Sequence, residues 1–242
     1  MEQIKAIHIS PTKNMLEVDM HYNKGLNILL THLVLNNDEY RATALMLSGT
    51  KYLDNSFFEL GYCLSPKAMI EAAELIRQDG DTMVLICPDG TLDGMKEFKA
   101  QGYKVMAIPK SPAQFKDMMY DNRIDYVGVS EEHLAYRHSP GARYELFRDH
   151  IDAMMPKKKI HLLGGTDSIY EIGMLHPFRN YIYSWDSSTA IWQGHLGHRI
   201  NDIVRKDTTS VDFTVKVNLE KPEVVNNIKF IEKLLKGVEY EG

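Results

Sequence analysis

Short apolar runs rich in β-branched residues recur along the chain, and each is followed by polar turn residues and then by a stretch with helical spacing. The runs are nearly continuous in apolar residues and do not alternate, which is typical of parallel strands covered on both faces. We predict eight strands, at 27–35, 51–55, 83–87, 104–109, 125–130, 159–164, 181–186 and 211–217.

Amphipathic segments between these runs predict helices. We expect them over 66–78, 112–120, 141–154 and 222–236. The first has Ser65 as an expected N-cap and Pro66 at the first helical position, and Ser111 and Pro112 repeat that arrangement in the second. Alternating strands and helices predict an α/β fold, a single (β/α)8 TIM barrel. The chain of 242 residues is close to the roughly 250 of such a barrel, so residues 1–242 are expected to form one domain. An open doubly wound sheet is the alternative.

Composition narrows the class of protein. The chain is 44% hydrophobic and 25% charged, as in ordinary globular domains, and its net charge of −5 counts against a dedicated nucleic-acid-binding module. Cys63 and Cys87 are too few for a disulfide framework or a thiolate-rich zinc site. We expect neither a signal peptide nor a membrane span, and a cytoplasmic location, which would be the host cytoplasm if a phage encodes the chain.

Two carboxylates stand directly at the ends of predicted apolar strands, Asp54 and Asp186. Barrel enzymes place their sites at the rim where the carboxyl ends of the strands converge. Polar residues at strand ends are also ordinary turn formers. Aspartate is depleted within strands and expensive to desolvate, which favours a functional role for this pair. His161, inside another apolar run, is interpreted as a core histidine.

Four segments in order resemble the signature segments of tRNA-guanine transglycosylases: LDNSFFELG (53–61), DYVGVSEE (125–132), KIHLLGG (159–165) and YSWDSSTAIWQG (183–194). The closer match is to shortened relatives from phages and bacteria that put 7-deazaguanines into DNA. The resemblance covers about residues 27–200. The chain lacks the Cys-x-Cys-x-x-Cys zinc motif of the tRNA enzymes, and Ile108-Pro109-Lys110 stands where the family carries a base-binding glutamine.

The resemblance implies roles for individual residues. Asp186 matches the nucleophile and Asp54 the aspartate assigned to proton transfer, a pairing that follows the logic of retaining glycosidases. The expected base-binding residues are Asp89, Phe58, Glu59, Gly128, Leu163 and Gly164. His195, His198 and Arg199 follow the nucleophile strand, and we expect them to contact the nucleic-acid backbone. The His195-x-x-His198 pair lacks a nameable third ligand, so no metal site is expected.

The expected function is a transglycosylase that exchanges guanine in nucleic acid for a 7-deazaguanine through a covalent aspartyl intermediate, without a cofactor. DNA is the expected partner, tRNA the less favoured one, and a homodimer or an accessory protein is possible. One alternative is a glycosidase that removes a base or cleaves a nucleoside on the same barrel. The other is a non-catalytic nucleic-acid-binding subunit, in which both aspartates could be replaced without loss.

Overall fold

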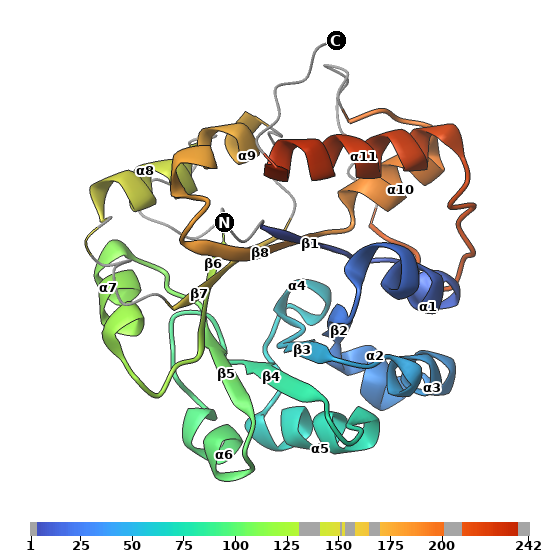
Figure 1. Ribbon diagram of the computed structural model, residues 1–242. Coiled ribbons are helices and arrows are strands. Elements are labelled where there is room, and N and C mark those ends of the chain that lie inside the picture. Colours follow the sequence, from blue (N-terminus) through green and yellow to red (C-terminus); the bar gives the residue numbers. More distant parts are fainter. Residues whose placement is uncertain are drawn as a thin grey trace.

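Eight parallel strands form one sheet that curls into a nearly closed barrel, as predicted (Figure 1). The computed structural model describes residues 4–130, 141–150, 152, 158–164, 170–200 and 210–236. The strands are β1 (Lys5–His8), β2 (Leu26–Leu30), β3 (Thr50–Asp54), β4 (Thr82–Ile86), β5 (Lys104–Ala107), β6 (Tyr126–Ser130), β7 (Lys159–Leu163) and β8 (Ile182–Ser187). Their order around the barrel is β1-β8-β7-β6-β5-β4-β3-β2.

Helices surround the strands on the outside, except the short α4, which lies within the ring of helices beside β3 (Figure 1). They are α1 (Met15–Val18), α2 (Thr31–Asn36), α3 (Asp38–Met46), α4 (Phe57–Leu60), α5 (Pro66–Ile76), α6 (Met95–Ala100), α7 (Pro112–Tyr120), α8 (Ala142–Asp149), α9 (Tyr170–Met174), α10 (Thr189–Leu196) and α11 (Pro222–Lys236). The predicted caps are present, because the hydroxyls of Ser65 and Ser111 accept hydrogen bonds from the first turns of α5 and α7. All four predicted helices exist, although α8 ends at Asp149.

Three sequence predictions about strands differ from the structure. The barrel begins with β1, which was missed because it is only four residues long and ends in a histidine. The segment 211–217 alternates as a strand would but is irregular: the carbonyl of Phe213 accepts from Thr12 N–H, and Val217 bonds to Asn14. The predicted strand 27–35 also stops at Leu30, where α2 begins.

A side chain closes the barrel where β1 meets β2. Among the described residues these two strands share no ladder of backbone hydrogen bonds. Asn23 bridges them: its Oδ1 accepts from His8 N–H at 2.8 Å, and its Nδ2 donates to the His8 carbonyl at 3.1 Å and to Asn27 Oδ1 at 3.3 Å. Asn23 is itself buried, so these bonds are shielded from water.

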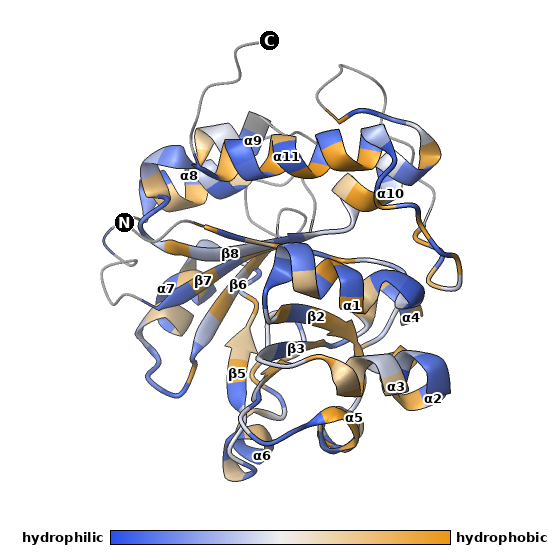
Figure 2. Ribbon diagram, turned by 45° about the vertical axis from the view of Figure 1, so that its right-hand side comes forward, coloured by the Kyte–Doolittle hydropathy of each residue, from blue (hydrophilic) through white to orange (hydrophobic). Residues whose placement is uncertain are grey.

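The apolar residues form two layers. One fills the barrel interior and comprises Ile7, Leu26, Tyr52, Val84, Ile86, Met106, Ile108 and Tyr126. The larger one lies between the strands and the surrounding helices, whose apolar stripes face inward (Figure 2). Since successive side chains of a strand point to opposite faces, Tyr52 inside the barrel places Asp54 on the inner face as well.

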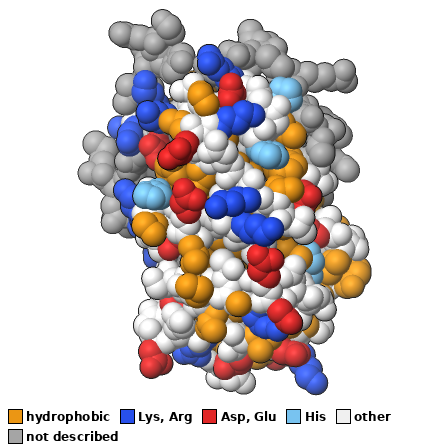
Figure 3. All heavy atoms as spheres, turned by 90° about the vertical axis from the view of Figure 1, so that its right-hand side faces the viewer, with side chains coloured by type: hydrophobic (Ala, Val, Ile, Leu, Met, Phe, Trp, Pro, Cys, Tyr) orange, Lys and Arg blue, Asp and Glu red, His pale blue; other side chains and the backbone are white. Residues whose placement is uncertain are grey.

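The outer surface is mixed in charge where Figure 3 shows it. Acidic and basic side chains alternate over that flank, and the described residues drawn there form no basic stripe. No helix in the described ranges is long and apolar enough to cross a membrane.

Candidate active site

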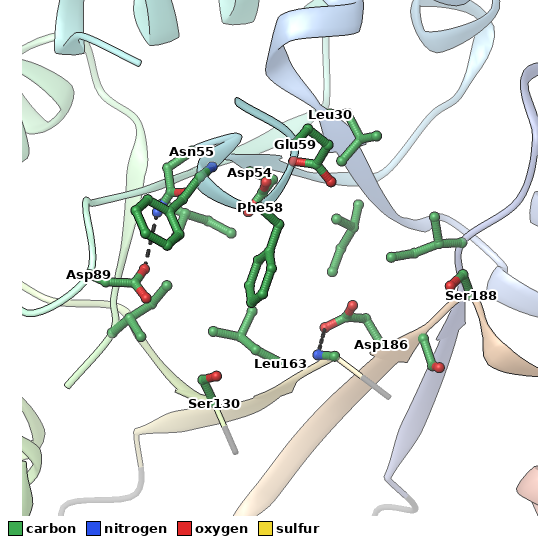
Figure 4. A pocket seen from close by; sticks show the side chains of 17 residues that line it. Leu30, Asp54, Asn55, Phe58, Glu59, Asp89, Ser130, Leu163, Asp186 and Ser188 are labelled. Carbon is green, nitrogen blue, oxygen red and sulfur yellow. Dashed lines mark hydrogen bonds between the residues drawn. The ribbon is translucent and has the colours of Figure 1, made fainter. Parts of the chain in front are cut away.

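A cavity of about 320 Å³ opens at the carboxyl ends of the strands. Seven of the predicted site residues line it: Asp54, Phe58, Glu59, Asp89, Leu163, Gly164 and Asp186. Figure 4 shows the carboxylates of Asp54 and Asp186 coming from different strands toward this cavity. Residues 132 positions apart in the sequence are thus brought together by the barrel, because β3 and β8 both end at this rim.

A tight turn after β3 fixes Asp54. Its Oδ2 accepts from Ser56 N–H at 2.9 Å, and its carbonyl accepts from the Thr31 hydroxyl at 2.5 Å. Ser56 has a φ of 62°, in the left-handed region that a residue with a side chain enters only at a cost of about 1–3 kcal/mol. The buried Ser56 hydroxyl accepts from His32 N–H at 3.2 Å, which holds this conformation. Strain of this kind recurs at sites where a turn has to aim a reactive group.

Burial raises the pKa of Asp54 to about 7. Removal of the carboxyl from water is the largest cause, and the negative charges of Glu59, Asp186 and Asp89 act in the same direction. The hydrogen bond from Ser56 opposes the shift. Near neutral pH, Asp54 is therefore divided between its acid and carboxylate forms, the condition under which a carboxyl works best as a proton donor and acceptor.

Asp186 is held from the neighbouring strand. Its Oδ1 lies 2.8 Å from His161 Nε2 and accepts from Gly164 N–H at 3.1 Å. The residue is only 5% exposed. In turn, the carbonyl of Gly164 accepts from Trp185 Nε1 at 3.1 Å, which ties the end of β7 to β8. The backbone N–H of Gly164 and the ring of His161 thus hold Asp186 in a fixed position.

A second polar group lines the opposite wall. Asn55 Nδ2 donates to the Cys87 carbonyl at 3.1 Å and to Asp89 Oδ1 at 3.3 Å, and Asn55 Oδ1 accepts from Phe57 N–H at 3.1 Å. Asp89 forms an ion pair with Lys110 Nζ at 2.5 Å. Lys110 was noted in the sequence only as a departure from the family pattern; here it neutralises one carboxylate of the site.

Aromatic and aliphatic side chains complete the cavity. Phe57 and Phe58, on the single turn of α4, are 36% and 67% exposed, and the Phe58 ring points into the cavity (Figure 4). Ile28, Ile86 and Ile108 line the deeper wall. An exposed ring over an apolar floor is suited to cover the flat face of an organic ligand.

Gly128 lies just beneath the cavity and does not line it. A Cβ at this position would come within 2.9 Å of Leu163 Cδ1, 3.0 Å of Met106 Sδ and 3.3 Å of Ile108 Cγ1. Leu163 and Ile108 are both lining residues, so the glycine sets how deep they sit.

The expected nucleic-acid contacts lie elsewhere. His195 and His198 follow the first turns of α10, which starts at the cavity and runs away from it. His195 stacks on Trp192, with ring centroids 5.2 Å apart, and the His198 carbonyl accepts from Asn227. Arg199 is exposed. None of the three lines the cavity, and their contact with a nucleic acid stays a prediction. The ends of two signature segments, 131–132 and 165, lie outside the described residues.

Sequence reasoning missed His161 as a residue of the site. It is fully buried, as interpreted, but it contacts Asp186 directly. Strand alternation was the signal that could have found it, because His161 and Leu163 are two residues apart on β7 and share a face. Among the described residues no group of three or more His, Cys, Asp or Glu side chains could hold a metal ion.

Comparisons with known proteins give the fold. No family model matches the chain, and no curated protein matches it. The chain is similar in structure to a Coccidioides immitis protein assigned as a fructose-1,6-biphosphate aldolase, with a TM-score of 0.54 and 14% identity over 98% of this chain and 89% of that one. It is also similar to the YdjI aldolase of Escherichia coli K12, with a TM-score of 0.50 and 12% identity over 98% and 88% of the two chains.

These findings correct the function expected from the sequence. These two solved structures are aldolases by name, and nothing in the comparisons supports a transglycosylase acting on nucleic acid. The exchange of guanine for a 7-deazaguanine, with its glycosidase and accessory-subunit alternatives, is therefore not carried further. At 14% and 12% identity the likeness shows the barrel fold alone.

Proposed function

We propose that the chain is an enzyme that transfers protons to and from a small organic substrate, with Asp54 as general acid and Asp186 as general base. One observation carries this proposal: the two carboxyls share one cavity, and burial raises the pKa of Asp54 to about 7. A pair of carboxyls in different environments can hold opposite protonation states, which is how acid and base roles are divided in many enzymes.

The two environments assign the roles. Asp54 lies among apolar side chains and other carboxylates, which favour its neutral form, so it can donate a proton. Asp186 Oδ1 accepts from the N–H of Gly164, just after β7, and lies 2.8 Å from His161 Nε2, so this carboxylate is placed as an acceptor. Asp186 would remove a proton from the substrate while Asp54 delivers one to the atom that gains electron density.

The lining residues favour a neutral or cationic substrate. They include the carboxylates of Asp54, Glu59, Asp89 and Asp186, and no lysine or arginine is among the described lining residues. Lys110 is close by, but its charge is matched by Asp89. A phosphorylated substrate, such as the one in the name of the Coccidioides protein, would meet repulsion here. The apolar walls and the Phe58 ring suit a ligand with at least one flat, apolar face.

Aldol cleavage of an unphosphorylated substrate is the first reaction to test, since both solved structures are named as aldolases. Asp186 would take the proton of the hydroxyl at the bond that breaks. The carbon–carbon bond then opens to a carbonyl and an enolate, and the enolate receives a proton from Asp54. The acid and base return to their starting forms when the two aspartates exchange protons with water.

The test is a turnover screen in heavy water. We would incubate the protein with sets of neutral hydroxyaldehydes and hydroxyketones, amines and heterocycles, and with phosphorylated counterparts, and follow products and deuterium uptake by NMR and mass spectrometry. We expect turnover of a neutral or cationic compound that is lost in Asp54→Asn and Asp186→Asn. Asp117→Asn, an exposed aspartate on α7, should behave as wild type. Turnover that survives in both site variants, or none in any set, would contradict the proposal.

A further inference from the structure

His161 connects Asp186 to the interior of the barrel. Its Nε2 lies 2.8 Å from Asp186 Oδ1, and its Nδ1 lies 2.8 Å from Ser184 Oγ. His161 and Ser184 are fully buried. A register shift between β7 and β8 at Ile160 and His161 sets His161 opposite Ser184. Irregularities of this kind re-aim side chains next to functional sites.

The plane of the imidazole ring is fixed as well. The ring of Tyr52 stacks on it with centroids 5.5 Å apart and planes inclined by 18°. Tyr126 packs edge-on against Tyr52 at 5.5 Å. With both nitrogens engaged and one face covered, His161 has a single orientation in which to meet Asp186.

The hydrogen bonds select one tautomer. Asp186 Oδ1 already accepts from Gly164 N–H, and an ionised carboxylate carries no proton to give. The proton between His161 and Asp186 must then lie on Nε2. Nδ1 is left as an acceptor, and the Ser184 hydroxyl can supply the matching donor.

The same three residue types form the triad of serine hydrolases, but here the order is reversed. In a hydrolase the serine faces the substrate and the aspartate is buried behind the histidine. Here Asp186 lines the cavity, and Ser184 lies beneath it at 0% exposure. The carboxylate is the group that can meet a substrate, and the histidine and serine support it.

We propose that His161 is a positioning residue that, as its Nε2–H tautomer oriented by Ser184, fixes the Asp186 carboxylate in the orientation that faces the cavity. The inference deepens the proposed function and rests on it, since Asp186 is the proposed base. When Asp186 takes a proton on Oδ2, the His161 proton stays on Nε2 and continues to bond to Oδ1. Partners of this type typically contribute about 10–100-fold to the function of the group that they hold.

The tautomer can be measured without a substrate. In protein labelled with ¹⁵N at histidine, we would record long-range proton–nitrogen correlations and identify His161 by its absence in His161→Gln. The expected pattern is a protonated Nε2 and an unprotonated Nδ1, with the Nδ1–H form gaining population in Ser184→Ala. A protonated Nδ1 in the wild type, as the other tautomer or as imidazolium, would overturn the inference even if turnover were found.

Turnover gives the second readout. For the compound identified in the heavy-water screen, we expect His161→Phe to lose about 10–100-fold in kcat with KM little changed. His161→Gln, which keeps an N–H donor, should recover part of the rate. His21→Gln, at an exposed histidine, should change neither constant. An unchanged kcat in His161→Phe would overturn the positioning role while leaving the proposed function intact. If no variant and no wild type turns over any compound, the proposed function fails, and the NMR result alone decides the placement of the proton.

Discussion

The burial of Asp54 decides at which pH this carboxyl holds its proton. Its pKa of about 7 in the folded chain lies above the value of 3.8 expected when it is exposed, so the folded state binds the proton more tightly than the unfolded state. The stability that this proton contributes is complete below about pH 4 and is lost as the pH rises through 7. The rise in the pKa of Asp54 corresponds to a contribution of at most about 4 kcal/mol to the free energy of unfolding. The contribution is smaller than this limit because the side chain is partly exposed.

We therefore predict that Asp54→Asn, which cannot ionise, is more stable than wild type by about 2 kcal/mol at pH 8 and equal to it at pH 4. Urea unfolding followed by circular dichroism at both pH values would measure the difference. Asp117→Asn serves as the control because its side chain is exposed. Equal stability at pH 8 would show that Asp54 is not desolvated as described.

His8 has the opposite effect on stability. Its side chain is 2% exposed, neither ring nitrogen has a hydrogen-bond partner among the described residues, and burial lowers its pKa to about 4. The unfolded chain therefore binds a proton more tightly, and stability is lost as the pH falls from about 6.5 to 4. We predict that His8→Phe resists this loss. The difference in the free energy of unfolding between His8→Phe and wild type should be about 2 kcal/mol more favourable to the variant at pH 4.5 than at pH 7.5. The same gain at both pH values would mean that only packing has changed.

Single residues of the site differ in how far the sequence can predict them. Asp54 and Asp186 were predictable because an aspartate at the end of an apolar strand is unusual, and the barrel brings such ends together. For His161 the strand alternation indicates the face on which it lies, but the sequence does not show that its partner is Asp186. The contact depends on the register between β7 and β8, which is set by packing.

At the scale of elements, a buried ion pair joins the helices outside β6 and β7. Arg143 on α8 and Glu171 on α9 are both fully buried. Arg143 donates to Glu171 Oε2 from Nε at 3.1 Å and from Nη2 at 2.6 Å, and its Nη1 donates to the Leu163 carbonyl at 3.2 Å. Leu163 precedes Gly164, so the pair also supports the strand end that holds Asp186.

We predict that Glu171→Gln destabilises the fold by about 3–5 kcal/mol, because it leaves the guanidinium buried without a counter-charge. Thermal and urea unfolding would measure this loss. Glu145→Gln, a half-buried glutamate on the same helix as Arg143, should cost less than about 1 kcal/mol. A loss in Glu171→Gln as small as that control would show that the pair is open to water.

Helices were predictable where capping residues or a long apolar stripe mark them in the sequence. The Ser-Pro starts of α5 and α7 and the long apolar stripe of α11 were readable from the sequence. β1 was too short to recognise, and 211–217 alternates like a strand without pairing as one. Whether an alternating segment joins a sheet depends on its long-range contacts, and here 211–217 bonds to Thr12 and Asn14, which lie outside the strands.

For the whole molecule, closure of the barrel depends on Asn23. Its side chain makes three hydrogen bonds at the β1–β2 seam, to the backbone of His8 and to Asn27. We predict that Asn23→Ala costs about 2–4 kcal/mol, since it leaves buried backbone groups unpaired. Hydrogen exchange should accelerate first in β1 and β2. Exchange that rises evenly around the barrel would place the weak point elsewhere.

The barrel itself was predictable, because the number and spacing of apolar runs fit it. The chemistry carried on it was not, since one barrel supports many reactions through its strand ends and loops. The resemblance to transglycosylases depended on short segments that turned out to surround a real cavity. The convergence of these residues on one cavity supports the proposed site, and the reaction has to be argued from its acid and base.

The most direct test of the account is the titration of Asp54 itself. In protein labelled with ¹³C at the aspartate carboxyls, the resonance that disappears in Asp54→Asn would be followed from pH 3 to 9. We predict a midpoint near pH 7, well above the value of 3.8 for an exposed aspartate. A midpoint near 4 would mean that Asp54 is a carboxylate at neutral pH, and it would contradict its role as the proton donor of the site.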